Sequence, residues 1–124
     1  MKKAGGGKIL NNGAMLSLFG FPKGLAYGSS KGGIMQMTRS HATAWAQDNI
    51  QVNCYLPSWI NTDLTVKARE DAPGLSKKVL ARTPAGRWGE PSDLAGLADY
   101  LASPASDFLT GTKIPIDGGF SIAV

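Results

Sequence analysis

The residues of this sequence with the clearest capacity for chemistry are Tyr27 and Lys31, in the run Tyr27-Gly28-Ser29-Ser30-Lys31. Two side chains four residues apart on a helix lie on the same face, one above the other. A lysine ammonium beside a phenol favours the phenolate form, so such a tyrosine can exchange a proton with a substrate oxygen near neutral pH. Tyrosine and lysine are also common on helix surfaces, so a plain surface pair is the competing interpretation.

Composition and length predict one folded domain over residues 1–124. The chain is 43% hydrophobic and 18% charged, which is typical of globular proteins. No apolar run approaches the roughly 18 residues of a membrane span, and Met1–Gly7 lacks the apolar core of a secretory signal. The single Cys54 lies in an apolar run, which indicates a buried residue in a reducing compartment and predicts a cytoplasmic location.

The formal net charge of +4 does not by itself indicate a nucleic-acid partner. The thirteen lysines and arginines are scattered, and the dense pairs Lys2-Lys3 and Lys77-Lys78 have no interleaved aromatic residues. No cysteine–histidine cluster is present, so no metal site is expected. His41 has no base or metal ligand near it in sequence, and we expect it on a helix surface.

Apolar periodicity and turn residues predict alternating strands and helices. The expected strands cover residues 8–12, 50–56 and 113–117, and the expected helices cover 25–47 and 91–102. This alternation is typical of an α/β fold with three parallel strands and flanking helices. Pro115 removes a donor from the last strand and predicts an edge position for that strand.

Residues at helical spacing form a semi-apolar stripe on the first long helix, which we expect to be left exposed in a single copy of the chain, and a buried stripe on the second. Those of the first helix are Ile34, Met37, His41 and Trp45, and those of the second are Leu94, Ala98, Leu101 and Ala102.

The runs that flank the Tyr-x-x-x-Lys motif carry a family resemblance. They are Lys8-Ile9-Leu10-Asn11-Asn12-Gly13-Ala14 and Ile50-Gln51-Val52-Asn53-Cys54-Tyr55-Leu56-Pro57. With the motif, they closely resemble the short-chain dehydrogenase/reductase family, from about Gly5 to Gly119. The likeness covers only the second half of a family member, and Met15–Gly20 and Gly86–Asp93 look most like its gluconate and deoxygluconate dehydrogenases.

The resemblance implies a partial Rossmann-like fold, the second half of a doubly wound sheet. It places the two long helices on opposite faces, so that one crossover is of the uncommon left-handed kind. It implies catalytic roles for Tyr27 and Lys31, and a cofactor, NAD or NADP, held by Lys31, Pro57, Ile60 and Thr62. It also implies that residues 64–88 form a mobile helical lid over a small-molecule substrate.

Two positions depart from the family pattern. Ala14 stands where the family usually has the serine that hydrogen-bonds the substrate oxygen, and Ser17 is a possible substitute for it. Ser58 stands where glycine is usual. The Gly-rich turn that binds a pyrophosphate is absent from these residues, because Gly5–Gly7 precedes a strand instead of following one. We therefore expect this chain alone to bind neither NAD nor NADP.

Three functional hypotheses follow. The chain is part of an NAD(P)-dependent oxidoreductase of alcohols or sugar acids, inactive as a dehydrogenase alone. It is a non-enzymatic, self-associating protein. Alternatively, it is a weak ester hydrolase that uses Tyr27 or a nearby serine with Lys31 as base. In each case we expect a homo-oligomer, because three strands and two helices leave one strand edge and much apolar surface open.

Overall fold

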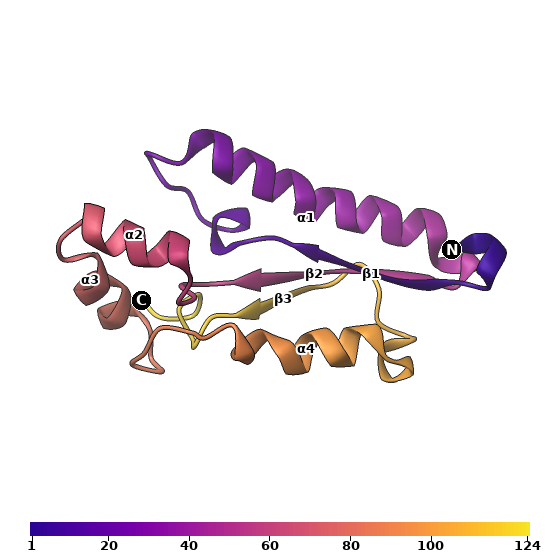
Figure 1. Ribbon diagram of the computed structural model, residues 1–124. Coiled ribbons are helices and arrows are strands. Elements are labelled where there is room, and N and C mark those ends of the chain that lie inside the picture. The colour runs from indigo at the N-terminus through magenta and orange to yellow at the C-terminus, as the bar shows by residue number, and fades with distance from the viewer.

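A computed structural model describes residues 1–124 and contains one three-stranded parallel sheet (Figure 1). The strands β1 (Gly7–Asn12), β2 (Ile50–Pro57) and β3 (Lys113–Ile116) lie in that order, with β2 in the centre. Helix α1 (Leu25–Trp45) joins β1 to β2, and α4 (Ser92–Ala102) precedes β3. The predicted α/β fold with three parallel strands is confirmed, and the helix and strand limits agree with the expected ones within a few residues.

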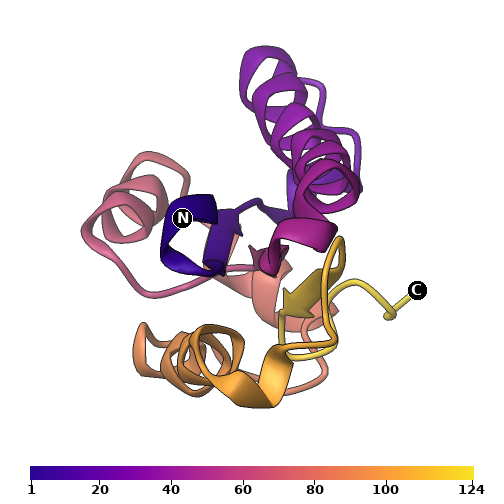
Figure 2. The same ribbon diagram turned by 90° about the vertical axis from the view of Figure 1, so that its right-hand side faces the viewer.

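The two long helices lie on opposite faces of the sheet, as the family resemblance implied. Figure 1 shows α1 on one side of the strands and α4 on the other, and Figure 2 shows the same arrangement along the strands. Because the strand order advances in one direction, helices on opposite faces require crossovers of opposite hand. Pro115 lies in β3, which pairs only with β2 and is therefore an edge strand, as predicted.

The chain enters the sheet through a turn that only glycine permits. Gly6 has a φ of 123°, and a Cβ atom there would lie 2.2 Å from the carbonyl oxygen of Asn49. Asn49 is itself left-handed, with a φ of 57°, and its Nδ2 donates to the carbonyl of Gly5. The two turns before β1 and β2 are thus held together, which sets the register of Gly7 opposite Ile50.

The α1 face of the sheet is closed by two apolar clusters. One is centred on Met15, Cys54 and Leu56, and the other on Ala42, Ile50 and Val52. Alternate residues of β2 supply both clusters, as expected of a strand whose side chains alternate between faces. Cys54 is fully buried, as predicted, and this burial raises the pKa of its thiol.

The semi-apolar stripe of α1, which we expected to be exposed, is partly packed on the core. The residues of α1 that are buried are Thr38 and Ala42, whose small size lets the helix approach β2. Ile34 and Trp45 pack at the margins of the two clusters, whereas Met37 is 42% exposed. Thr38 is accommodated because its hydroxyl donates to the carbonyl of Ile34 and accepts from Asn11 Nδ2. Apolarity alone could not identify a threonine on the buried face.

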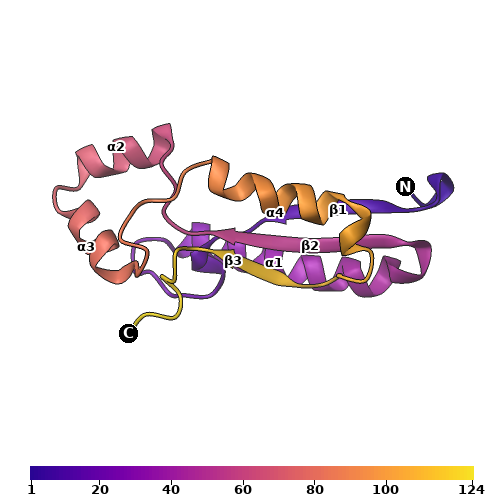
Figure 3. The same ribbon diagram turned by 90° about the horizontal axis from the view of Figure 1, so that it is seen from below.

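The stripe expected on α4 is also only partly buried. Leu101 is buried, but Ala98 and Ala102 are exposed and Leu94 is half-buried. The reason is the position of the helix: its contacts with the sheet are chiefly with β1, and Figure 3 shows it lying over β1 and leaving β3 uncovered. No helix of the chain is long and apolar enough to cross a membrane.

The region expected to form a lid contains two short helices, α2 (Asp63–Asp71) and α3 (Leu75–Arg82). Both lie beyond the carboxyl ends of the strands, at the same end of the molecule as the start of α1 (Figure 1). Gly74, with a φ of 89°, makes the tight connection between them.

Candidate active site

Tyr27 and Lys31 lie on the first turns of α1, next to the carboxyl end of β1. Lys31 Nζ lies 5.6 Å from the centroid of the Tyr27 ring and donates a hydrogen bond of 2.9 Å to the carbonyl oxygen of Asn12. The helix thus presents both side chains on one face, as their spacing predicts. Tyr27 is 51% exposed, so its phenol is accessible to a small molecule. This geometry suits proton exchange with a bound substrate.

Ala14 lies directly after β1 and presents only a methyl group. It is 7% exposed, with an extended backbone at φ −164°, and its N–H donates to Ser17 Oγ at 3.2 Å. Ser17 in turn donates to the backbone carbonyl of Lys31 at 2.8 Å. The Ser17 hydroxyl therefore fastens the turn after β1 to the helix that carries the lysine. This is a positioning role, and it leaves no donor at the place where the family has its serine.

The loop after β2 carries the residues that the resemblance assigns to the cofactor. Pro57 is the last residue of β2, and Thr62 is the N-cap of α2. Between them, Ile60 forms a parallel bridge with Gly89, in which Asn61 N–H donates to the Gly89 carbonyl at 2.7 Å. The N–H of Ile60 makes no hydrogen bond within the chain. A free backbone donor on a loop held on both sides fits the recognition of a carboxamide oxygen.

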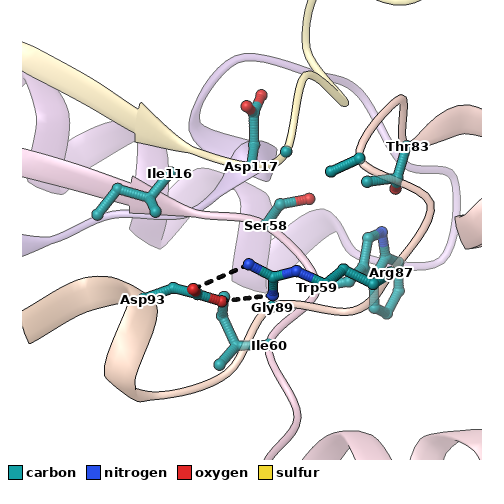
Figure 4. Close-up of a pocket in the computed structure, with 11 residues that line it drawn as sticks. Ser58, Trp59, Ile60, Thr83, Arg87, Gly89, Asp93, Ile116 and Asp117 are labelled. Atoms are coloured by element: carbon teal, nitrogen blue, oxygen red, sulfur yellow. Dashed lines mark hydrogen bonds and ion pairs between the residues drawn. The ribbon is translucent and has the colours of Figure 1, made fainter.

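Ser58 is tolerated in this loop where the family usually has glycine. Its φ is not in the left-handed region, where Asn49 is the only residue other than glycine, so the serine causes no backbone strain. Its hydroxyl is buried and has no hydrogen-bond partner in the chain. Figure 4 shows Ser58 at the centre of a pocket of about 230 Å³, which Ile116, Asp117, Thr83 and Arg87 also line. Neither Tyr27 nor Lys31 lines this pocket.

An ion pair forms one wall of the pocket. Arg87 donates from both terminal nitrogens to Asp93, at 2.7 and 2.9 Å, as the dashed lines in Figure 4 show. Asp93 also accepts from the N–H of Glu90 at 2.7 Å. The Arg87 hydrogen bonds, followed by that of Glu90, lower the pKa of Asp93 from 3.8 to about 2. The same contact raises the pKa of Arg87.

Asp117 lies on the opposite wall, after β3. Burial raises its pKa, but hydrogen bonds from Ser121 and from the N–H of Gly119 outweigh burial and leave the pKa lowered. Both carboxylates of the pocket are thus stabilised in their charged form. Through these hydrogen bonds the two carboxylates stabilise the turns that adjoin the pocket. Since both are charged at neutral pH, neither is a proton donor there.

Aromatic and amide contacts connect α2 and α3 to the neighbouring loops. Arg69 of α2 donates to Asn61 Oδ1 at 2.6 Å and lies 4.4 Å from the Trp88 ring centroid. Trp88 Nε1 donates to Ser76 of α3 at 3.1 Å. Arg82 at the end of α3 lies over the rings of Phe19 and Phe120, the first of which belongs to the loop before α1. Sequence reasoning missed these residues, because the partners are far apart in the chain.

Residues 64–88, the region expected to form a lid, carry the net charge of the protein. Residues 64–88 contain six lysines and arginines and two acidic residues, a net charge of +4 that equals the formal net charge of the whole chain. Of these six cations only Arg87 forms an ion pair. The rest of the chain is therefore neutral. The helices α2 and α3, which lie within the positively charged residues 64–88, are at the same end of the molecule as the start of α1 (Figure 1). This clustering of positive charge can be read from the sequence when the charges of residues 64–88 are counted apart from those of the other residues.

Comparison with known proteins supports the family resemblance. A family model described as enoyl-(acyl carrier protein) reductase matches residues 1–121. The chain therefore belongs to the short-chain dehydrogenases/reductases. It is 45% identical over 120 residues to the 2-dehydro-3-deoxy-D-gluconate 5-dehydrogenase of Dickeya dadantii, an alignment that covers 97% of this chain and 47% of that protein.

Two further relatives are similar to nearly the whole of this chain. The galactitol 2-dehydrogenase of Cereibacter sphaeroides is 40% identical, over 98% of this chain and 48% of that protein. The gluconate 5-dehydrogenase of Burkholderia cenocepacia, solved in complex with NADP and tartrate, superposes with a TM-score of 0.94 at 37% identity, over 99% of this chain and 48% of that one. The chain thus spans about half the length of the relatives that it matches.

Proposed function

We propose that this chain is the proton-transfer and substrate-binding half of an NAD(P)-dependent oxidoreductase that acts on a hydroxyl or carbonyl group of a sugar acid. The observation that carries the proposal is the accessible Tyr27–Lys31 pair at the carboxyl end of β1, beside a lid of net charge +4. In the direction of carbonyl reduction, the Tyr27 phenol donates its proton to the carbonyl oxygen, and in the direction of alcohol oxidation the phenolate accepts one. Lys31 lies beside the Tyr27 ring and is held against the sheet by its hydrogen bond to the Asn12 carbonyl.

The residues of the loop after β2 suit a nicotinamide. We propose that the free N–H of Ile60 and the hydroxyl of Thr62 bind the carboxamide of the nicotinamide, next to Pro57. We propose that Lys31 contacts the cofactor from the opposite side of the site. When bound, the nicotinamide supplies or accepts the hydride. These residues form only part of a dinucleotide site, because no Gly-rich turn in this chain precedes a helix that could bind the pyrophosphate. We therefore propose that the chain alone has no dehydrogenase activity.

Electrostatics favours a sugar acid over a neutral polyol. Both kinds of substrate are named among the relatives, as a gluconate and as galactitol. A surface region with a net charge of one sign attracts ligands of the opposite sign. The lid cations without acidic partners therefore favour a carboxylate-bearing substrate, and the cation at Arg69 is held in place by Asn61 and Trp88.

The alternatives have less support. An ester hydrolase needs a nucleophile next to a free base. The hydroxyls of Ser17 and Ser30 donate to backbone carbonyls, and Lys31 donates to Asn12, so no serine–lysine pair is formed. Self-association does not exclude an enzymatic role, and we propose it in addition, through the exposed residues of α1.

The test uses the chain alone and a fusion. We expect fluorescence titration of the isolated chain with NADPH to show no saturation at micromolar cofactor, and saturable binding would contradict the proposal. In a fusion to the dinucleotide-binding half of a relative, Tyr27→Phe should abolish oxidation of gluconate, and sorbitol should be a poorer substrate than gluconate. Ala14→Ser in the fusion should raise turnover by roughly 10²-fold, the effect of one transition-state hydrogen-bond donor. Equal rates with Ala14 and serine would show that another group polarises the substrate.

A further inference from the structure

Arg82, the last residue of α3, is a cation whose hydrogen-bond donors have no partner in the chain. It is exposed, it takes part in none of the ion pairs, and its guanidinium nitrogens make no hydrogen bond. The other two arginines of residues 64–88 are engaged, because Arg87 forms an ion pair and Arg69 donates to Asn61. Arg82 is therefore the arginine of this region that can offer its whole set of N–H groups to a ligand.

Two aromatic rings hold this guanidinium in place. Its Cζ lies 5.1 Å from the centroid of the Phe19 ring and 4.4 Å from that of Phe120. Both rings pack against the buried cluster of Met15, Cys54 and Leu56, so the core fixes the surface under the arginine. Cation–π attraction holds a guanidinium over an aromatic ring without using its N–H groups. The cation is thus positioned while its donors remain available.

The backbone next to Arg82 is anchored as well. Thr83 is buried, and its hydroxyl donates to the Val79 carbonyl at 2.7 Å. The N–H of Ala85 donates to the Gly118 carbonyl at 3.0 Å, which ties the segment after α3 to the turn after β3. Since main chain and guanidinium are both held, the side chain loses little freedom when a ligand binds. Such preorganisation raises affinity.

The contact with Phe19 places this cation near the proton-transfer pair, Tyr27 and Lys31. Phe19 belongs to the loop that joins β1 to α1. In the same loop, the Ser17 hydroxyl donates at 2.8 Å to the Lys31 carbonyl, so the loop is fastened to the turns of α1 that carry the pair. The loop therefore contacts α1 through Ser17 and the arginine through Phe19. Figure 1 shows α3 and the start of α1 at the same end of the molecule.

A carboxylate is the ligand that such a guanidinium selects. The planar fork of an arginine donates two parallel hydrogen bonds to the two oxygens of a carboxylate, whereas a lysine ammonium acts as a point charge. A neutral hydroxyl has a single oxygen and no charge, so it forms a weaker contact. No acidic side chain of the chain lies within ion-pair distance of Arg82 to compete for it.

We propose that Arg82 binds the carboxylate of the substrate and thereby sets the preference for a sugar acid over a neutral polyol. The inference rests on the proposed function and names the residue that recognises its substrate class. The reacting hydroxyl is bound at Tyr27, and the carboxylate is bound at the edge of the site formed by Phe19 and Arg82. Because the carboxylate does not react, the contact is equally strong in the ground state and the transition state. Its loss therefore raises KM and leaves kcat nearly unchanged.

A first test measures carboxylate binding by the isolated chain and does not depend on activity. The Nε–Hε NMR signal of Arg82, assigned with Arg82→Met, is followed during titration with sodium gluconate, and with sorbitol and sodium chloride as controls. We expect gluconate alone to shift the signal, with half-saturation at roughly 10–100 mM, the affinity of one charge-assisted contact. Absence of a shift at about 100 mM gluconate, or an equal shift with the controls, would overturn the proposal.

A second test uses the fusion to the dinucleotide-binding half of a relative. Arg82→Met keeps a flexible side chain over Phe19 and Phe120 but removes the donors. It should raise the KM for gluconate about 10- to 100-fold at nearly constant kcat, and leave oxidation of sorbitol unchanged. Arg82→Lys should recover only part of the loss. Lys113→Met removes the same charge at an exposed residue that begins β3, and should change neither substrate.

The two tests separate this inference from the proposed function. An unchanged KM for gluconate in Arg82→Met, or an equal loss with gluconate and sorbitol, would refute the role of Arg82 and leave the oxidoreductase assignment intact. A fusion inactive toward both substrates, with the gluconate-dependent NMR shift retained, would contradict that assignment and support the carboxylate contact. Thermal melting of Arg82→Met verifies that the variant is folded.

Discussion

The two faces of the sheet are closed by different kinds of interaction, and the central strand shows the contrast directly. Toward α1, β2 presents a row of fully or nearly fully buried apolar residues, Ile50, Val52, Cys54 and Leu56. Toward α4 it presents Gln51, Asn53 and Tyr55. Asn53 is 1% exposed, and its amide bonds to the Leu109 carbonyl at 2.7 Å and to the Thr112 N–H at 3.2 Å.

The two faces therefore differ in the interactions that stabilise them and in how fully they are covered. The α1 face derives its stability from apolar burial and already has its covering helix. On the α4 face, specific hydrogen bonds hold the connection to β3, and the apolar residues of α4 line a groove. A face held by hydrogen bonds keeps its shape without being filled by apolar side chains. The following predictions test the comparison, from the largest expected effect to the smallest.

Truncation of matched leucines on the two faces should have unequal effects. Leu56 of β2 is fully buried and packs in one cluster with Met15, so Leu56→Ala should lower the free energy of unfolding by about 2–5 kcal/mol. Leu97→Ala, in the groove, removes the same atoms from a half-buried position and should cost about 1 kcal/mol or less. Urea denaturation measures both. Similar losses would show that the α4 face contributes as much packing as the α1 face.

The buried amide of β2 should be the main contributor to stability on the α4 face. Asn53→Ala leaves the Leu109 carbonyl and the Thr112 N–H without their partner, which should cost about 1–3 kcal/mol. Hydrogen exchange should show faster opening of residues 109–112. Gln51→Ala is the matched control, because the Gln51 amide bonds only to the Asn49 side chain. A smaller loss from Asn53→Ala than from Gln51→Ala would contradict this account.

The outer surface of α1 should mediate self-association. Leu25 is 82% exposed and Met37 42% exposed, and a Cβ at Gly32 or Gly33 would meet nothing within 4 Å. Since Ile34 and Trp45 already pack on the core, we expect a moderate, micromolar dimer. Sedimentation should detect it, and Met37→Asp should weaken it about 10-fold, as expected for the loss of part of one apolar contact. A monomer throughout the micromolar range would refute self-association.

Acid should weaken the start of α4 before it weakens the α1 face. Asp93 has a pKa of about 2 in the folded chain against an ordinary 3.8, so its contribution to stability is complete above pH 4 and disappears as the pH falls toward 2. The effect should be small, because the pair with Arg87 is exposed. Asp93→Asn should flatten the stability profile between pH 4 and 2, and Asp99→Asn, at an exposed residue of α4 without an ion pair, is the control. An unchanged slope would show that Asp93 does not titrate with folding.

The sequence by itself determined the three-stranded sheet and, within a few residues, the limits of its strands and of the two long helices. Strand and helix periods, glycine turns and proline stops act over a few residues, so a local pattern suffices to predict them. The spacing of Tyr27 and Lys31 is likewise a local property of one helix. Burial of Cys54 followed from the apolar run around it, because every other residue of that run faces α1.

Only the tertiary structure decided which apolar residues are covered, and which polar ones are buried. Thr38 and Asn53 are buried because partners 27 and 56 residues away satisfy their hydrogen bonds. Ser17 is engaged with the Lys31 carbonyl, so the missing serine at Ala14 has no substitute among the turn residues. Ala98 and Ala102 are exposed because α4 lies over β1 at the margin of the sheet. Burial depends on what lies opposite a side chain in space, and a periodic pattern in one segment carries no information about that neighbour.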